Sequence, residues 1–365
     1  MRILHVLPIL APGGMERLVI QLTADATGRG DSVVVASAPG VWVAKVEDAG
    51  AAHVALPATT RGSALGLATG TAKATVLLAR CMRRARPDVV HAHNVRATAL
   101  ARAAIVLSHH RAVLVPTLHG LAPSDYAGAC RILRRTAQRV IACAPSVARS
   151  LEAAGFPGPR IDVITNGAAM RPAGAQRQAD LRTALKLGPA PLVVGIGRLV
   201  EQKNWPVFIE AAGRVEGAAF VVAGDGPLRS ELTDLARRSG NRVRFLGMVD
   251  DIAALVGLAS CVVSTSTWEG LPLTLLEALS LGAPVVATAV AGVTDLVPPN
   301  AALFVPPGDP GAVAEAISKV LAEDEVAGQL RNSALLVAPS WGPDHMLDRY
   351  RNAYKAACAG EPRWA

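Results

Sequence analysis

Short runs of apolar residues, each of strand length, alternate along most of the chain with longer segments of helical pattern. The runs are continuously rich in Val, Ile and Leu and do not alternate with polar residues. Strands that helices cover on both faces of a parallel sheet have this composition. The alternation therefore predicts an α/β fold built from doubly wound parallel sheets.

The predicted strands form two series, and a chain of 365 residues is too long for one ordinary core. The first series comprises 3–7, 32–37, 54–56, 89–93, 113–118, 140–143 and 161–164, and the second comprises 192–196, 219–223, 243–246, 261–264, 285–287 and 302–304. A segment rich in Pro, Gly, Gln and Arg separates them. We expect a first domain at 1–170, a linker at 171–190, a second domain at 191–344, and a C-terminal helix at 345–365 that packs back toward the first domain.

Composition supports a packed globular protein, with 51% hydrophobic and 18% charged residues. The apolar start, residues 1–10, contains His5 and Pro8 and lacks a small-residue cleavage site, so a first strand is predicted there instead of a signal peptide. Two uncharged stretches, 252–268 and 278–294, contain hydroxyl residues, Gly or Pro. They are predicted to divide into strand, loop and helix and not to cross a membrane.

The five cysteines are scattered, odd in number and without a CxxC pair; they are Cys81, Cys130, Cys143, Cys261 and Cys358. This pattern indicates reduced thiols in a cytoplasmic protein and argues against a zinc site.

Charge is unevenly distributed. Residues 1–175 hold 20 basic and 9 acidic side chains, a net charge of +11, whereas residues 176–365 hold 17 and 20, a net charge of −3. The two halves are therefore expected to bind different partners.

Three residues that suit an anion follow the strand predicted at 192–196. Gly197 permits close approach of the backbone, Arg198 offers a bidentate fork to a phosphate, and Lys203 adds a mobile positive charge. Charged turn residues are also commonly solvated. A phosphate site and a solvated turn both remain open at this point.

The sequence Gly224-Asp-Gly226-Pro227 ends another predicted strand and opens a helix. Its two glycines resemble part of a phosphate loop, but GxG alone is a weak signal. We favour tight-turn chemistry, because glycine permits backbone conformations that other residues avoid.

The segment from Glu269 to Glu277 carries the strongest functional signal. Glu269 lies just before a predicted helix with Pro272 in its first turn, where free N–H groups attract an anion. Glu277 lies about one and a half turns inside that helix. Carboxylates accept hydrogen bonds from hydroxyl groups, so the segment suits a diphosphate with a sugar at one end and a ribose at the other. The alternative makes Glu269 a partner of the helix dipole and Glu277 a surface residue.

In the first half, Gly13 and Gly14 form a strand-to-helix turn that permits a ligand to approach the backbone. His91 and His93 close a later strand. The pair suggests a metal site, but no third or fourth ligand lies nearby in the sequence, so structural histidines are preferred and no metal is predicted. His119 closes the next strand and is compatible with a structural or a site role.

Taken together, these motifs resemble the retaining glycosyltransferases of GT-B architecture, most of all glycosyltransferase family 4, over nearly the whole chain. In order they are Gly13-Gly14-x-Glu16, Asp88-Val-Val-His91-x-His93, His119-Gly120, Asn166-Gly167, Gly197-Arg198-Leu199 with Lys203, Gly224-x-Gly226-Pro227, and Glu269 to Glu277 followed by Pro284-Val-Val-Ala-Thr288. The resemblance implies two Rossmann-like domains that face each other across a cleft. The acceptor would bind the first domain and a nucleotide-sugar donor the second, without a metal or another cofactor.

The resemblance also implies roles for individual residues. His119 and Glu269 would act at the reacting sugar, His119 by positioning it and Glu269 by contacting its hydroxyls. The donor-binding residues would be Gly13, Gly14, Gly197, Arg198, Lys203, Met248, Val249, Gly270, Leu271, Pro272, Leu273 and Glu277. The acceptor-binding residues would be Glu16, His93 and Arg96. Asp295 stands where the family often has Glu, and this shorter acid is assigned no sugar contact.

Arginines cluster in two segments of the basic half, at positions 80, 83, 84 and 86 and at positions 131, 134, 135 and 139. Arg131, Arg135 and Arg139 recur every four residues and are predicted to share a helix face. One hypothesis is that this face rests on anionic lipid at the inner surface of the cell membrane, near a lipid-linked acceptor. A solvated arginine-rich face explains the pattern equally well.

The implied function is transfer of a hexosyl unit from a UDP- or GDP-sugar to a glycan or lipid-linked acceptor, with retention of configuration, in cell-envelope, exopolysaccharide or glycolipid biosynthesis. One alternative is a nucleotide-sugar epimerase of the same architecture. Another is a basic nucleic-acid-binding protein, which is disfavoured because three Tyr and five Phe offer few stacking platforms. A non-catalytic homologue is disfavoured by the presence of Arg198, Lys203, Glu269 and Glu277.

Overall fold

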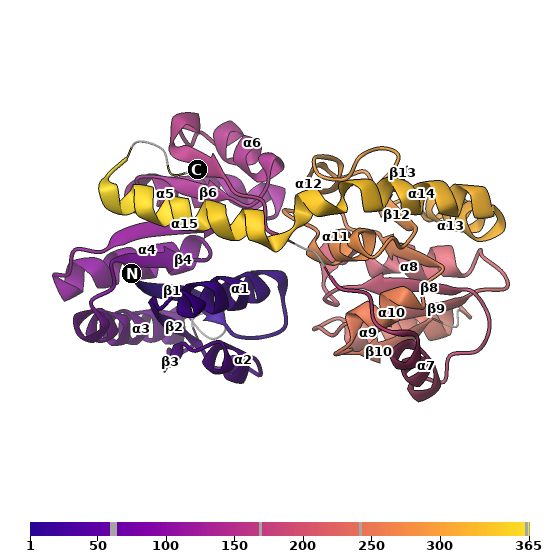
Figure 1. Ribbon diagram of the computed structural model, residues 1–365, viewed down its shortest axis with the longest axis horizontal. Helices are drawn as coiled ribbons and strands as arrows, with labels where there is room; N and C mark the ends of the chain where they lie inside the picture. Colours follow the sequence, from indigo (N-terminus) through magenta and orange to yellow (C-terminus); the bar gives the residue numbers. More distant parts are fainter. Residues whose placement is uncertain (59–63, 168–169, 241–242, 362–363, 365) are drawn as a thin grey trace. The chain divides into compact units, whose positions relative to one another are not determined.

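A computed structural model describes residues 1–58, 64–167, 170–240, 243–361 and 364 (Figure 1). The chain divides into two compact units. Met1–Asn166 and Asp344–Ala365 form the first unit, and Gly167–Pro343 forms the second. The C-terminal helix is therefore part of the first unit.

The first unit contains a seven-stranded parallel sheet with the order β3-β2-β1-β4-β5-β6-β7. Its strands are β1 (Arg2–Ile9), β2 (Ser32–Ala38), β3 (Ala52–Ala55), β4 (Val89–Ala92), β5 (Val113–Leu118), β6 (Val140–Ala142) and β7 (Ile161–Val163). Its α-helices are α1 (Gly14–Gly28), α2 (Val43–Asp48), α3 (Ala64–Ala85), α4 (Val95–Ser108), α5 (Tyr126–Thr136), α6 (Pro145–Ala153) and α15 (Pro343–Ala359). Short 3-10 turns lie at Pro123–Asp125 (η1) and Gly158–Arg160 (η2).

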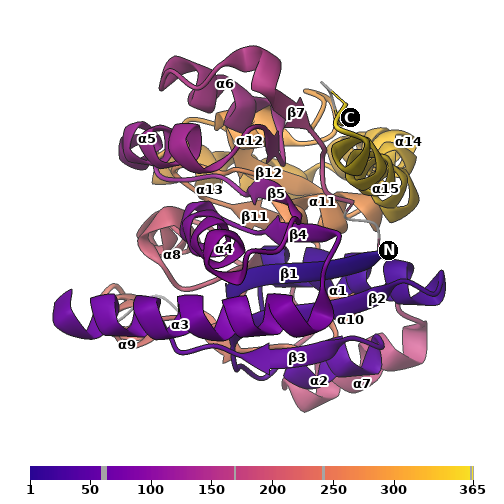
Figure 2. The ribbon, with the colours of Figure 1, turned by 90° about the vertical axis from the view of Figure 1, so that its left-hand side faces the viewer.

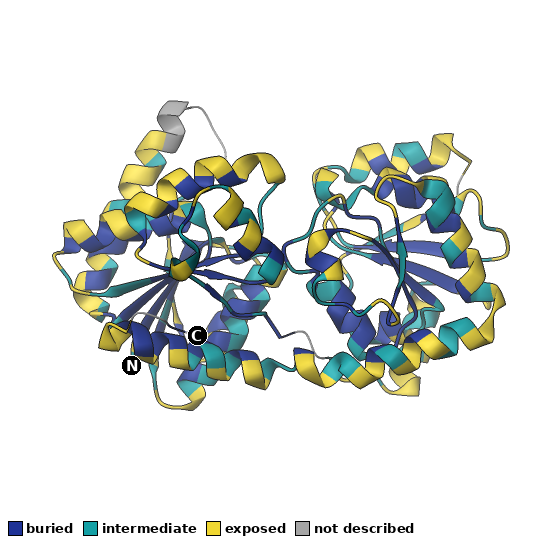
Figure 3. Cartoon of the chain, turned by 90° about the horizontal axis from the view of Figure 1, so that it is seen from above, coloured by how far each residue is buried: buried dark blue, intermediate teal, exposed yellow. Residues whose placement is uncertain are grey.

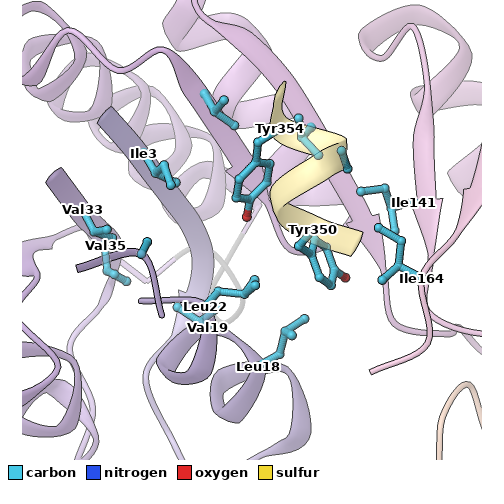
Figure 4. Close-up of a cluster of buried hydrophobic side chains, with 14 of the residues drawn as sticks. Ile3, Leu18, Val19, Leu22, Val33, Val35, Ile141, Ile164, Tyr350 and Tyr354 are labelled. Carbon is cyan, nitrogen blue, oxygen red and sulfur yellow. The ribbon is translucent and has the colours of Figure 1, made fainter. Parts of the chain in front are cut away.

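Helices cover both faces of this sheet because successive strand side chains point to opposite sides. Ile3 of β1 packs with α1 and with α15, whose Tyr350 and Tyr354 are buried (Figure 4). The next residue, Leu4, packs on the other face in a cluster that α3 and α4 complete. The two apolar clusters fix the sheet between these helices.

The second unit contains a six-stranded parallel sheet with the order β10-β9-β8-β11-β12-β13. Its strands are β8 (Leu192–Ile196), β9 (Ala219–Ala223), β10 (Arg244–Gly247), β11 (Cys261–Ser264), β12 (Val285–Thr288) and β13 (Leu303–Val305). Its α-helices are α7 (Ala175–Ala184), α8 (Trp205–Ala212), α9 (Arg229–Arg238), α10 (Ile252–Gly257), α11 (Leu273–Ser280), α12 (Ala291–Thr294), α13 (Pro310–Ala322) and α14 (Asp324–Val337). The 3-10 turns are η3 (Glu201–Lys203) and η4 (Ala338–Trp341).

The thirteen strands predicted from apolar runs are all present, with β1 longer than expected and β3 displaced toward the N-terminus. Most strand residues are buried, and the strands at the centre of each unit are mainly dark blue in Figure 3. The segment expected to act as a linker, 171–190, contains α7, which packs on α10, and Arg177 Nε lies 2.7 Å from Asp251 Oδ2.

Candidate active site

In each sheet the strands are first added on one side of the unit's first strand and then on its other side. In the second unit it runs outward from β8 through β9 to β10 and then returns to β11, which lies on the other side of β8. The loops that follow β8 and β11 therefore diverge, and open parallel sheets bind ligands at such a switch point. The predicted Arg198–Lys203 and Glu269–Glu277 motifs lie in or directly after these two loops.

An ion pair joins the two loops of the second unit. Lys203 Nζ donates to Glu269 Oε1 at 2.5 Å, and the two side chains are only 17% and 4% exposed. Ser266 Oγ donates to the same oxygen at 2.6 Å, and Gln202 Nε2 donates to Glu269 Oε2 at 3.3 Å. Lys203 is therefore not a solvated turn residue, and Glu269 is a buried carboxylate held in one orientation.

Ser266 and Gln202 were absent from the predicted site. Both are uncharged: Gln202 lies next to Lys203 within the Arg198–Lys203 segment, and Ser266 lies in the Ser-Thr-Ser-Thr run before Glu269, the one sequence signal that hydroxyl groups gather there.

Arg198 differs from Lys203 in that its side chain is exposed. Its carbonyl oxygen accepts a hydrogen bond from Trp205 Nε1 at 2.9 Å, and Trp205 is itself buried in the core. The core thus anchors the backbone of this loop, while the side chain of Arg198 remains exposed.

Glycines allow the neighbouring loops to approach closely. Gly224 has a φ of +143°, and a Cβ on it would lie 1.9 Å from the carbonyl oxygen of Gly197. A Cβ on Gly226 would lie 2.5 Å from the carbonyl oxygen of Leu199. These contacts favour the tight-turn interpretation of the two glycines, which let the loop after β9 pack against the loop after β8.

Gly292 likewise allows a close approach of the backbone, here to Glu269. A Cβ on Gly292 would lie 2.2 Å from the carbonyl oxygen of Glu269. Thr288 Oγ1 also donates to the carbonyl oxygen of Ser266 at 2.6 Å. The end of β12 and the start of α12 therefore pack against the Glu269 loop, while Asp295 lies half-buried just after α12.

Glu277 is buried, with 3% of its surface exposed, which rules out the surface alternative for this residue. It lies on α11, which begins at Leu273 with Pro272 as its N-cap. Gly270 and Leu271 lie in the loop before this helix start, with Gly270 in a bend. Glu269 and Glu277 thus lie on either side of the residues expected to bind sugar and phosphate.

The loop after β10 lies at the same carboxyl edge of the sheet, next to the loop after β9. The N–H of Gly224 donates to the carbonyl oxygen of Gly247 at 2.7 Å. Met248 is exposed and Val249 is partly buried. An exposed methionine at this edge is compatible with the predicted contact to a nucleotide base.

In the first unit the switch point lies between β1 and β4. Gly13 is the N-cap of α1, and a Cβ on it would lie 2.3 Å from Glu16 Oε2. Glu16 is buried and folds back against the glycine loop. The structure therefore places this predicted acceptor residue beneath the loop.

Three histidines lie side by side at this switch point. The parallel register pairs His5 on β1 with His91 on β4. His5 Nδ1 and His93 Nε2 are 3.0 Å apart, and the ring of His119 stacks on that of His93 at a centroid distance of 5.8 Å. His5 was missed as a member of this cluster because no pattern within β1 points to its partner on β4.

Burial controls the protonation of these histidines. It lowers the pKa of His5 to about 3 and that of His119 to about 4. Burial, and then the neighbouring imidazoles, hold the pKa of His91 and His93 well below the usual value. All four side chains are therefore neutral at pH 7, when each ring has one N–H and one bare nitrogen.

The ligand atoms of His5, His91 and His93 lie within 4.8 Å of one another, so the fold supplies the third ligand that the sequence lacked. That ground for rejecting a metal was wrong. However, His91 Nδ1 lies 2.7 Å from Tyr354 Oη and His91 Nε2 lies 2.7 Å from Thr117 Oγ1. Because both nitrogens of His91 already have partners, this side chain has no nitrogen left for a metal ion in the arrangement described.

Arg139 does not belong to the predicted arginine face. Helix α5 ends at Thr136, and Arg139 is buried, with Nε and Nη2 each 2.9 Å from an oxygen of Asp162. The prediction from the four-residue spacing was wrong for Arg139, because the helix ends before this residue. Arg131, Arg134 and Arg135 are exposed on α5.

None of the helices in the described part of the chain combines the length and apolarity that a membrane span requires. All five cysteines lie within the described residues and none forms a disulfide.

Two family models match the sequence. Residues 12–170 match Glycosyltransferase Family 4, and residues 190–323 match Glycosyl transferases group 1. The chain is 30% identical to the lipopolysaccharide core biosynthesis glycosyltransferase LpsE of Rhizobium meliloti, over 68% of this chain and 69% of that protein. It is 28% identical to the 2-deoxystreptamine N-acetyl-D-glucosaminyltransferase of Streptomyces fradiae, over 97% and 94% of the two chains.

Among solved structures, Anabaena HepE in complex with UDP-glucose is similar with a TM-score of 0.86 at 21% identity, covering 97% of this chain and 99% of that one. At this identity the similarity shows the fold. The family matches, the relatives and the two switch-point sheets together show that this chain belongs to glycosyltransferase family 4 and has the GT-B architecture.

Proposed function

We propose that this glycosyltransferase moves a hexosyl unit from a UDP- or GDP-sugar to a glycan or lipid-linked acceptor, with retention of configuration, in cell-envelope, exopolysaccharide or glycolipid biosynthesis. The observation that carries the proposal is the Lys203–Glu269 ion pair at the switch point of the second unit. The names of two similar proteins support it, because LpsE acts in lipopolysaccharide core biosynthesis and HepE was solved with UDP-glucose.

We propose that different residues bind the two ends of the donor. Arg198 and Lys203 bind the diphosphate, and Lys203 can do so without leaving Glu269 because an ammonium group has three donors. Glu269 accepts hydrogen bonds from sugar hydroxyls, since a carboxylate would repel the phosphates. Glu277 binds the ribose diol, Met248 and Val249 border the base, and the backbone from Gly270 to Leu273 surrounds the sugar and phosphate.

In the first unit, Gly13 and Gly14 offer backbone N–H groups to the donor, and Glu16, His93 and Arg96 bind the acceptor. His119 positions the reacting sugar as a neutral imidazole, because its pKa of about 4 leaves it uncharged at pH 7. Its Nε2 has no hydrogen-bond partner among the described residues and is available to a hydroxyl group. The acceptor hydroxyl attacks from the side of the leaving group, which preserves the configuration.

A panel of UDP-, GDP- and ADP-sugars tested by thermal shift examines the donor assignment. A ligand that binds only the native state stabilises it by about 2.7 kcal/mol at 100 times its Kd. We expect a UDP- or GDP-sugar to raise the melting temperature of the wild type. Arg198→Ala and Lys203→Ala should abolish that rise, measured against each variant's own baseline, whereas Lys319→Ala, at an exposed lysine of α13, should keep it. Failure of every donor would overturn the proposal.

The epimerase alternative makes a separate prediction. An epimerase releases a free, altered sugar in the absence of any acceptor, whereas a transferase requires the acceptor for product formation. Product analysis with and without acceptor distinguishes the two. A salt-sensitive mobility shift with nucleic acid would instead favour the nucleic-acid-binding alternative.

We further propose that the protein is cytoplasmic and touches an anionic membrane through the exposed basic side chains of α3, α4 and α5, here called the basic face. Helix α4 packs against both α3 and α5, so the three helices form one surface (Figure 2). The basic face comprises Lys73, Arg80, Arg83, Arg84, Arg102, Arg131, Arg134 and Arg135. Flotation with vesicles that contain or lack anionic lipid tests this contact, and absence of binding at low salt would remove it.

A further inference from the structure

A cavity of about 520 Å³ lies at the carboxyl edge of the first sheet. It is bounded by the ends of β1, β2 and β3 and by helices α3 and α4, and its volume is typical of a small-molecule site. Its apolar wall includes Leu7, Pro8, Leu56, Ala74, Leu100 and Ala103.

Small side chains keep this space open. Ala74 of α3 and Ala97 and Ala103 of α4 face it where larger residues would fill it. Ala74 and Ala97 are buried, so the hollow continues inward from the surface. An apolar ligand that occupies it would replace water along most of the wall, which favours binding in proportion to the apolar area covered.

The polar groups around the cavity limit the chemistry of its ligand. Asn94 Oδ1 already accepts from the N–H of Ala97 at 2.7 Å, and Thr75 Oγ1 donates to the carbonyl oxygen of Thr71 at 2.9 Å. Arg96 lines the cavity with an exposed side chain, and no Asp or Glu is among the described residues around it. The site therefore suits an apolar group attached to an anion and lacks a partner for a diamine such as 2-deoxystreptamine.

The same two helices carry the basic face on their outer sides. Lys73 and Arg80 of α3 and Arg102 of α4 are exposed, and none of them lines the cavity. Exposed apolar residues lie among these cations, namely Val76, Val106, Leu107 and Ile132. Cations mixed with exposed apolar side chains are typical of a surface that contacts anionic lipid.

We propose that the cavity binds the hydrocarbon chain of a phosphate-bearing acceptor lipid, with the phosphate at Arg96. This proposal rests on the proposed transferase function and deepens it, because it chooses a lipid phosphate over a soluble glycan as the acceptor. The basic face brings the protein to the bilayer surface, and the cavity takes one chain from it. Arg96 forms a charge-assisted pair with the phosphate at the cavity rim.

Farnesyl phosphate is a suitable probe because it contains one apolar chain and one phosphate. Its saturable binding to the full-length protein can be measured by calorimetry and compared with that of farnesol and of inorganic phosphate. We expect farnesyl phosphate to bind at least tenfold more tightly than either. Equal binding of inorganic phosphate would indicate an anion site only and would overturn the proposal.

Substitutions that fill the cavity test directly whether it holds the hydrocarbon chain. Ala103 is exposed at the rim and Ala99 is half-buried, so Ala103→Phe and Ala99→Leu should fold and weaken binding by about tenfold or more. The second variant keeps the test decisive if the first does not fold. Ala179→Phe, at an exposed alanine of α7 in the second unit, is the matched control and should bind as the wild type does.

Replacing Arg96 distinguishes binding of the phosphate from binding of the hydrocarbon chain. Arg96→Gln should weaken binding of farnesyl phosphate by about tenfold and leave that of farnesol unchanged. Undiminished binding of farnesyl phosphate to Ala103→Phe and Ala99→Leu would overturn the proposal. If the UDP- or GDP-sugar shift persists while farnesyl phosphate does not bind, only the lipid assignment fails; if the sugar shift is also absent, the proposed function fails with it.

Discussion

The switch points of the two units share one topology and differ in their chemistry. In the first unit β1 carries His5, β4 carries His91, and His93 follows β4 directly; all three are buried and neutral. In the second unit the corresponding loops carry the charged pair of Lys203 and Glu269. In both units the strand order makes neighbouring loops diverge and leaves room for a ligand. The residues on and after the strands then determine whether this place presents neutral hydrogen-bonding groups or charged ones.

The two units also differ in where their histidines lie. All eight histidines of the sequence lie in residues assigned to the first unit, and none lies between 167 and 343. Because the second unit contains no histidine, only the first should respond to mild acid through protonation of imidazole groups. The following predictions test this contrast, from the largest effect to the smallest.

Removing the carboxylate of the charged pair should have the largest effect. Glu269→Ala is expected to lower turnover at saturating donor by about 10²–10³-fold, the loss typical of one preorganised polar group at a reacting centre. The variant also leaves Lys203 without its buried partner, which costs stability.

Glu269→Gln keeps the shape and should lose nearly as much turnover. Glu201→Ala, which removes an exposed carboxylate of η3, is the control and should remain active. Full activity of Glu269→Ala would contradict the assigned sugar contact.

Mild acid should destabilise the first unit more than the second. The pKa of His5 is about 3 in the folded state and about 6.5 when unfolded, so the unfolded state binds more protons below pH 6.5. Stability is therefore complete above pH 6.5 and falls as the pH decreases toward 3. At pH 5 His5 alone should cost about 2 kcal/mol, and the other buried histidines add to this.

Hydrogen exchange at pH 7.5 and pH 5, corrected for intrinsic rates, resolves the two sheets. Protection of β1 and β4 should decrease more than that of β8 and β11. Equal losses in both sheets would break the proposed contrast.

The glycine behind Glu269 should not tolerate a side chain. In Gly292→Ala the new Cβ meets the carbonyl oxygen of Glu269, so the loop must move, at a cost of about 1–3 kcal/mol of unfolding free energy and part of the activity. Gly328 lies in α14, where an added Cβ would meet no atom within 4 Å, so Gly328→Ala should be neutral or stabilising. Urea unfolding measures both, and equal stability of the two variants would show that the loop is not supported there.

The smallest effect is expected at the hydrogen bond that ties α15 to the histidine cluster. Tyr354→Phe removes the hydroxyl 2.7 Å from His91 Nδ1 and should cost about 1 kcal/mol of unfolding free energy. Donor binding in the second unit should not change. A loss of the donor-induced thermal shift in this variant would show that the two units are not chemically separate.

The strands were predictable because helices cover both faces of each sheet, which leaves continuous apolar runs in the sequence. The loops that carry Arg198, Lys203 and Glu269 were predictable for a related reason, since functional residues follow strands in such sheets. Arg139 was misassigned because spacing alone does not reveal that α5 ends at Thr136.

The sequence by itself determined the alternation of strands and helices and the kinds of residue at the strand ends. Only the tertiary structure decided which of these residues meet. Lys203 and Glu269 are 66 residues apart, and His5 and His93 are 88 apart. The sheet order brings each pair together, because adjacent parallel strands place their carboxyl ends at one edge however long the intervening chain is. The same packing buries Glu277 and the histidine cluster. Burial disfavours the charged form of the imidazoles and so keeps these histidines neutral.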